Sequence, residues 1–141
     1  MTIFFLINLS SSLFLCGLIW MIQVVHYPIF HRLEKEEFIS HMEFHQRKIS
    51  FVVIPVMMAE LITSGVLSFF SEQFQILHIT GLILVLLVWV ATFFYSVPLH
   101  SALMDGYSRE SVNKLCSTNR LRVFLWTAKA VLSLYILFSL I

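Results

Sequence analysis

Four long apolar segments occupy most of this chain of 141 residues, near 3–27, 50–70, 75–97 and 122–141. Each reaches the roughly 20 apolar residues that an α-helix needs to cross the hydrocarbon core of a bilayer. Hydrophobic residues make up 59% of the chain and charged residues 12%, whereas a soluble domain has about half and about a quarter. The sequence therefore predicts an all-α integral membrane protein that forms a single domain over residues 1–141.

The positions of the Lys and Arg residues predict how the four spans are oriented. Eight of the nine lie at or beyond the same ends of the apolar segments: Arg32, Lys35, Arg47, Lys48, Arg109, Lys114, Arg120 and Arg122. Because cytoplasmic loops are enriched in Lys and Arg, we expect both termini outside and the two longer loops in the cytoplasm. Short up-and-down connections predict an antiparallel four-helix bundle, placed as a multi-pass protein in the cell inner (plasma) membrane.

Prolines predict where two of the helices end. Pro28 and Pro98 follow the first and third apolar segments. A proline disfavours helical backbone in the residue before it. We therefore expect the first helix to end or kink after about His26 and the third to end near Val97.

The second and fourth helices are expected to begin outside the membrane. Helical periodicity starts near Glu34, and Pro55 lies inside the predicted second helix, where a kink is expected. Ser108 follows a turn and is a suitable N-cap for a fourth helix that starts near Arg109. Both helices would then project into the cytoplasm before they enter the bilayer.

Polar residues within the apolar segments recur at helical spacing, which places each set on one face of its helix. Such residues would cost several kcal/mol each if they faced lipid. All four faces are therefore expected to point toward a common interior. In chain order, these faces carry Asn8, Ser12, Gln23 and His26, then His45 and Glu60, then Thr92, Ser96 and His100, and finally Asn119, Arg122, Trp126, Lys129 and Ser133.

Glu60 and Lys129 are the only ionisable residues deep inside the predicted spans. Opposite charges at similar depth predict a pair, which is either a buried ion pair that fixes helix register or a proton relay or substrate counter-charge. A third alternative is that Lys129 extends alone toward the interface. Both side chains are expected to lean toward the cytoplasm, because helical side chains tilt toward the N-terminus of their helix.

Histidines gather at the predicted cytoplasmic ends of three helices. His26, His45 and His100 lie there on the inward faces, whereas His41 is interpreted as surface. Because neutral imidazole is a common metal ligand, the three are candidate ligands for a divalent metal. Haem held by two of them is a second candidate. The alternatives are a hydrogen-bonded structural or substrate-binding group and unrelated interfacial residues.

Two cations, Arg120 and Arg122, lie where the fourth helix enters the membrane. One interpretation is the positive-inside signal with contact to phospholipid headgroups. The other is a grip for the phosphate or carboxylate headgroup of a lipid-like substrate. Arg122 is the better candidate because it shares a face with Asn119 and Trp126, and these three residues with Gln23 are the predicted substrate-binding set.

Four motifs carry a resemblance to known proteins: HYPIF at 26–30, PVMMAE at 55–60, VPLHSALMDG at 97–106 and NRLRVFLWTAK at 119–129. The chain resembles a family of small, functionally uncharacterised bacterial four-span membrane proteins. It is more loosely similar to the anthrone-oxygenase-like membrane proteins. The first resemblance implies the topology, and the second implies oxidoreductase chemistry without indicating catalytic residues.

These observations leave three classes of function open. The first is a metal-dependent oxidoreductase or related enzyme on a hydrophobic or lipid-like substrate, with catalytic candidates His26, His45, His100, Glu60 and Lys129. The second is a small-ligand or proton-coupled binding or transport module. The third is a non-catalytic membrane subunit. In each case the lipid bilayer is the surrounding partner, and a homo-oligomer is compatible with the sequence.

Other classes lack sequence support. The net charge of +1 gives no indication of nucleic-acid binding. The chain has no P-loop, no GxSxG motif and no CxxC motif, so neither nucleotide hydrolysis nor thiol redox chemistry is predicted.

Overall fold

The computed structural model of the protein describes residues 1–140, apart from the side chain of Lys35. Within this part of the chain the only regular secondary structure is helical, which confirms the predicted all-α class. Four helical segments are long and apolar enough to cross a membrane: Thr2–Ile29, Glu36–Phe70, Gln75–Met104 and Arg109–Leu140.

The first and third segments are built in the same way, from an α-helix, one π-helical turn and a second α-helix. The π turns are labelled η and each has five residues. The first segment consists of α1 (Thr2–Met21), η1 (Ile22–His26) and α2 (Tyr27–Ile29). The third consists of α4 (Gln75–Ala91), η2 (Thr92–Ser96) and α5 (Val97–Met104).

Each π turn ends two residues before a proline, Pro28 or Pro98. In a regular α-helix a proline ring clashes with the carbonyl group four residues earlier, which here belongs to Val24 or Phe94 within the π turn. The wider π turn relieves that clash. The expected helix ends near His26 and Val97 are therefore wrong, because the first and third helical segments continue to Ile29 and Met104.

The second and fourth segments are single α-helices. α3 (Lys35–Phe70) passes through Pro55 without ending, and α6 spans Arg109–Leu140. Ser108 caps α6, since its hydroxyl oxygen accepts a hydrogen bond of 3.2 Å from the backbone N–H of Ser111. Both predicted helix starts are confirmed.

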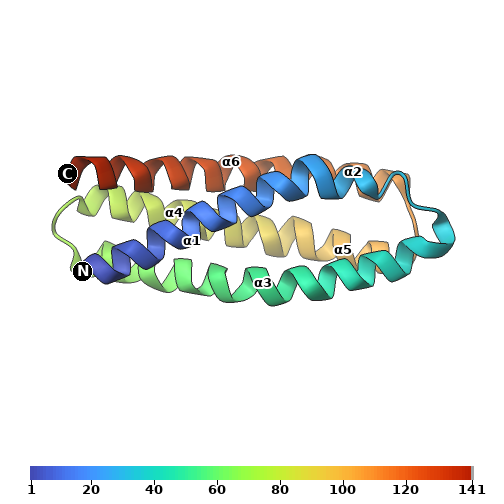
Figure 1. The fold of residues 1–141 in the computed structure, drawn as a ribbon, viewed down its shortest axis with the longest axis horizontal. Helices are drawn as coiled ribbons and strands as arrows, with labels where there is room; N and C mark the ends of the chain where they lie inside the picture. The colour runs from blue at the N-terminus through green and yellow to red at the C-terminus, as the bar shows by residue number, and fades with distance from the viewer. Residues whose placement is uncertain (141) are drawn as a thin grey trace.

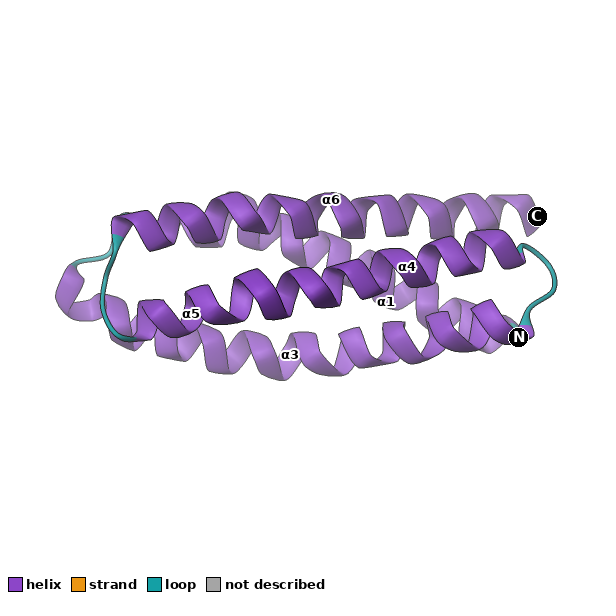
Figure 2. Ribbon diagram, turned by 180° about the vertical axis from the view of Figure 1, so that it is seen from behind, coloured by secondary structure: helices purple, strands orange, loops and turns teal. Residues whose placement is uncertain are grey.

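The four segments lie side by side, with α1 and α4 each packed against both α3 and α6 (Figures 1 and 2). In the described part of the chain the backbones of α1 and α4, and those of α3 and α6, lie diagonally opposite each other, and side chains such as Trp126 and Glu60 meet across the interior. Both termini lie at one end of the molecule, which we call the terminus end (Figure 1). The opposite end, where α2 and α5 lie and where α3 and α6 begin, is called the histidine end.

Candidate functional site

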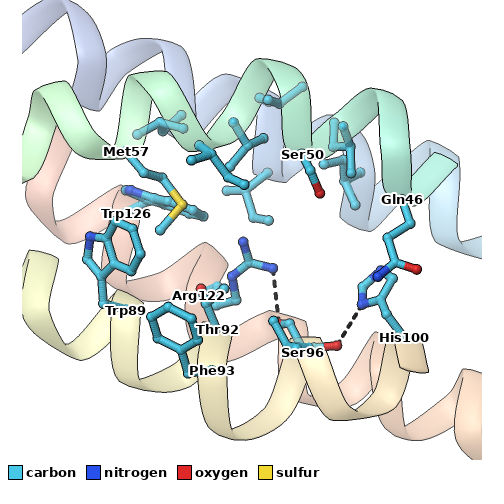
Figure 3. Close-up of a pocket in the computed structure, with 18 of the residues that line it drawn as sticks. Gln46, Ser50, Met57, Trp89, Thr92, Phe93, Ser96, His100, Arg122 and Trp126 are labelled. Atoms are coloured by element: carbon cyan, nitrogen blue, oxygen red, sulfur yellow. Dashed lines mark hydrogen bonds between the residues drawn. The ribbon is translucent and has the colours of Figure 1, made fainter. Parts of the chain in front are cut away.

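A cavity of about 300 Å³ lies between the helices in the half of the molecule nearer the histidine end (Figure 3). Most of its wall is apolar, formed by side chains such as Leu15 and Met57. This size is at the lower end of the range for small-molecule sites, which are typically apolar clefts with a few fixed polar groups. The polar residues in its wall are Tyr27, His45, Gln46, Ser50, Thr92, Ser96, His100 and Arg122.

Arg122 places its guanidinium group in this cavity (Figure 3) although its side chain is only 7% exposed. Its Nη1 donates hydrogen bonds to Oγ of Ser96 (3.1 Å) and Oδ1 of Asn119 (3.3 Å). Its Nε is buried without a hydrogen-bond partner. The guanidinium carbon lies 5.1 Å from the centre of the Trp126 ring, so a cation–π contact also holds it.

No acidic side chain balances this cation in the wall of the cavity. The lining residues include neither Asp nor Glu, and Arg122 is the only Lys or Arg among them. Removing a charge from water without a counter-charge is costly. The two neutral acceptors and the aromatic ring offset only part of that cost. The arrangement therefore suits a ligand that brings a negative charge to Arg122.

The predicted substrate-binding residues come together around this cation. Asn119 accepts from Arg122 and donates through Nδ2 to Oε1 of Gln23 over 2.9 Å. Gln23 belongs to η1, so one polar chain joins the first and fourth helical segments. Trp126 lines the cavity directly, whereas Gln23 and Asn119 lie behind its wall and orient Arg122.

The three predicted site histidines also come together, with their rings stacked. The ring centres of His26 and His45 are 4.1 Å apart with an interplanar angle of 26°. Those of His45 and His100 are 5.9 Å apart at 18°. His45 and His100 line the cavity, whereas Nε2 of His26 is buried without a hydrogen-bond partner. His41 is exposed, as expected.

The stacking gives no support to the predicted metal site at His26, His45 and His100. An imidazole binds a metal through a nitrogen lone pair in the plane of its ring, and the lone pairs of parallel stacked rings do not converge on one point. Among the described residues no group of three or more His, Cys, Asp or Glu side chains is arranged to hold a metal ion. The stacked rings also do not face each other across a gap that a porphyrin could fill, so the haem alternative is not supported either.

His100 is fixed by its own helix. Its Nδ1 lies 2.7 Å from the backbone carbonyl oxygen of Ser96. A carbonyl can only accept, so Nδ1 carries the proton and Nε2 is the acceptor in the neutral ring. Ser96 thus contacts both His100, through its carbonyl group, and Arg122, through its hydroxyl group.

Glu60 lies deeper, toward the terminus end, and is 1% exposed. Its Oε1 accepts from Oγ of Ser12 over 2.7 Å, and its Oε2 accepts from Nε1 of Trp126 over 3.1 Å. Both carboxylate oxygens therefore have neutral donors. The carboxylate points toward the histidine end, because it binds Ser12, whereas the backbone carbonyl oxygen of Glu60 binds Asn8, one turn nearer the terminus end of α1.

The side chain of Lys129 points in the opposite direction, toward the terminus end. Its Nζ donates to Oδ1 of Asn8 over 2.7 Å and to Oγ of Ser133 over 3.0 Å, and Ser133 is one turn nearer the terminus end. The prediction that both charged side chains lean toward the same end is thus wrong for Lys129. A flexible lysine follows its acceptors, and its stem passes over Gly81, where an added Cβ would lie 3.3 Å from Cε of Lys129.

The expected direct ion pair of Glu60 and Lys129 is replaced by contacts through α1. Asn8 accepts from Lys129 and donates to the backbone carbonyl oxygen of Glu60 over 3.2 Å. No direct Glu60–Lys129 hydrogen bond occurs in the described structure. The carboxylate and the ammonium group are instead held by separate sets of neutral partners.

The sequence did not indicate Tyr27 as a site residue. Tyr27 is 2% exposed and lines the cavity. It was expected to lie at a helix end, and only the continuation of the helix through η1 turns it inward. The HYPIF motif was the one signal that drew attention to it.

Comparisons of the chain with protein-family models, with curated proteins and with solved structures found no match.

Proposed function

We propose that this chain is an integral membrane protein whose four helical segments cross the bilayer as an antiparallel bundle. The outer surface supports this, because many large apolar side chains there are exposed, such as Phe51 (83%) and Ile76 (80%). Contact between these side chains and lipid is favourable, whereas their contact with water costs free energy.

The proposed orientation places the histidine end in the cytoplasm and both termini outside, in the inner membrane of the cell. The exposed cations lie in the half of the molecule toward the histidine end, as cytoplasmic loops require. These cations are Arg32, Arg47, Lys48, Arg109, Lys114 and Arg120. On this orientation α3 and α6 both begin outside the membrane, in the cytoplasm.

The proposed function is to bind a small amphiphilic molecule that has a negatively charged group and an apolar body. The single observation that carries it is the buried guanidinium of Arg122, which faces a cavity without any acidic side chain in its wall. Hydrogen bonds between ionised groups are about twice as strong as neutral ones. An anionic ligand would supply the missing partner, while the apolar wall would hold its body.

An enzyme that acts on the same ligand is the second candidate. The observation that favours it is the hydrogen bond between His100 and Ser96, which leaves Nε2 of His100 as an acceptor next to the anion site. A fixed neutral imidazole is the usual general base. Mass spectrometry of a ligand recovered after incubation separates the two functions, since binding alone returns it unchanged.

The binding function is tested with oleate and the protein in phosphatidylcholine nanodiscs. Charged hydrogen bonds contribute about 1.5–3 kcal/mol, so Arg122→Gln should weaken oleate binding roughly ten- to hundredfold. Arg120→Gln is the matched control, because it removes the same charge from an exposed position on the same helix. Arg122→Lys should retain part of the affinity. Equal affinities for the protein and its Arg122→Gln variant would refute the function.

A further inference from the structure

The cavity opens sideways between α3 and η2. In the described structure the backbone of α3 lies close to that of α4 and α5, the two neighbours of η2 in the chain, but not to that of η2 itself. Three residues that line the cavity are exposed beside this gap: Ile54 of α3 (53%), Phe93 of η2 (58%) and Val97 of α5 (44%). The opening therefore faces the outer, apolar side of the helices and not either end of the molecule.

The opening coincides with the π turn that precedes Pro98. A π turn changes the helical register locally and is frequent at functional sites. Here it separates two stretches that touch α3, so the helix remains anchored on both sides of the gap. The opening thus results from the backbone conformation of the π turn, and it does not require a loop to move.

The size of the cavity limits what part of a ligand it can enclose. About 300 Å³ suffices for a small charged group and a short apolar stretch, because sites that enclose drug-sized ligands extend to about 1,000 Å³. A longer body must leave through the side opening, past Ile54, Phe93 and Val97. These side chains are apolar, so the emerging part of the ligand must be a hydrocarbon chain.

The charge of the site limits the headgroup. One guanidinium faces the cavity, and no other Lys or Arg lines it. A phosphate monoester carries about 1.5 to 2 negative charges at neutral pH, which would leave charge uncompensated in an apolar wall. A carboxylate carries one charge and matches the planar guanidinium. The site thus favours a carboxylate over a phosphate monoester.

From these features we infer that the ligand is a single-chain carboxylate amphiphile of the fatty-acid class. It enters from the bilayer between α3 and η2, with its carboxylate at Arg122 and its chain remaining partly in lipid. This inference rests on the proposed binding function and adds the class of ligand and its route.

The test uses photocrosslinking in phosphatidylcholine nanodiscs with oleate that carries a terminal alkyne. Phe93→benzoylphenylalanine places the photoreactive group at the rim of the opening. Phe94→benzoylphenylalanine is the matched control, because Phe94 is the next residue of η2, is 73% exposed and does not line the cavity. Each variant is also made with Arg122→Gln, and the methyl ester of the probe replaces the acid in a parallel experiment.

At a probe concentration near the Kd of the unchanged protein, the expected result is a crosslink at position 93 that falls roughly ten- to hundredfold with Arg122→Gln, falls likewise with the methyl ester, and stays at background at position 94. Equal crosslinks at both positions that persist with Arg122→Gln would show contact with bulk lipid only and overturn the inference. Oleate binding that depends on Arg122 without a crosslink at position 93 would overturn the route while the binding function stands. Absence of Arg122-dependent oleate binding would refute the binding function itself.

Discussion

The indole N–H of Trp126 donates a hydrogen bond to Oε2 of Glu60 over 3.1 Å. The same ring lies against the guanidinium of Arg122 and lines the cavity. Trp126 therefore connects the proposed anion site with the deeper polar residues, because it contacts both Arg122 and Glu60. Because Glu60 binds the ring that lies against Arg122, its carboxylate holds this ring beside the proposed anion site.

A double-mutant cycle tests the finding that Glu60 and Lys129 are held by separate partners. Removing one member of a directly paired buried ion pair costs about 3–5 kcal/mol, and removing the second relieves much of that cost. Since no direct bond joins them here, Glu60→Gln and Lys129→Met should show a coupling energy below about 1 kcal/mol. Chemical unfolding in detergent measures it. Strong rescue in the double variant would indicate a direct pair.

Among the buried polar residues, Asn8 should be the one whose replacement lowers the stability of the protein most. Its Nδ2 shares two hydrogens among Oγ1 of Thr63 (2.9 Å), Oγ of Ser64 (2.8 Å) and the backbone carbonyl oxygen of Glu60 (3.2 Å), and its Oδ1 accepts from Nζ of Lys129. Asn8→Leu leaves several buried polar groups without hydrogen-bond partners, and each such group costs about 1–3 kcal/mol of stability. The melting temperature of this variant should therefore fall sharply.

Asn113→Leu is the control for that variant, because it makes the same change at an exposed position of α6. Its effect should stay within about 0.5 kcal/mol. Similar melting temperatures for the two variants would contradict the role of Asn8.

Two glycines should respond oppositely to alanine. Gly65 lies inside α3 and an added Cβ would meet nothing within 4 Å, so Gly65→Ala should stabilise the protein by about 1 kcal/mol through helix propensity. At Gly81 the added Cβ would lie 3.3 Å from Cε of Lys129. Since Asn8 and Ser133 hold Nζ, the stem cannot easily shift, and Gly81→Ala should destabilise. Thermal melts check both; stabilisation by Gly81→Ala would show that Lys129 is free to move.

Removing the cation of the proposed site should stabilise the protein when no ligand is present. Replacing buried charged groups by apolar residues of similar size is often stabilising, by about 1–4 kcal/mol. Arg122→Met should therefore raise the melting temperature of delipidated protein while abolishing oleate binding. A large loss of stability would mean that Arg122 serves the fold and not a ligand.

The sequence predicted the elements that depend on local patterns. Apolar run lengths gave the helical segments, and the capping serine gave the start of α6. The helical spacing of Asn119, Arg122 and Trp126 placed them on one face, and the structure brings Gln23 to that face. Such faces follow from the helical repeat alone.

What the sequence could not show depends on tertiary geometry. Periodicity shows on which face of a helix a residue lies but not in which direction its side chain extends along the helix axis. The opposite directions of the Glu60 and Lys129 side chains were therefore not predicted. Three histidines at neighbouring helix ends are compatible with converging or stacked rings, and only the packing decides. The π turns were missed because proline is more often a helix end than a site of register change.

A carboxylate-bearing chain is proposed to occupy the cavity beside Arg122, and quenching of tryptophan fluorescence measures its presence there. Trp89 and Trp126 line the cavity, whereas Trp20 is 48% exposed on α1. In a Trp20→Phe variant in phosphatidylcholine nanodiscs, only the two cavity residues contribute fluorescence. Dibromostearate should quench this fluorescence saturably at one molecule per chain, and Arg122→Gln should raise the concentration needed for saturation roughly ten- to hundredfold. Quenching that never saturates, or that is unchanged by Arg122→Gln, would contradict the claim.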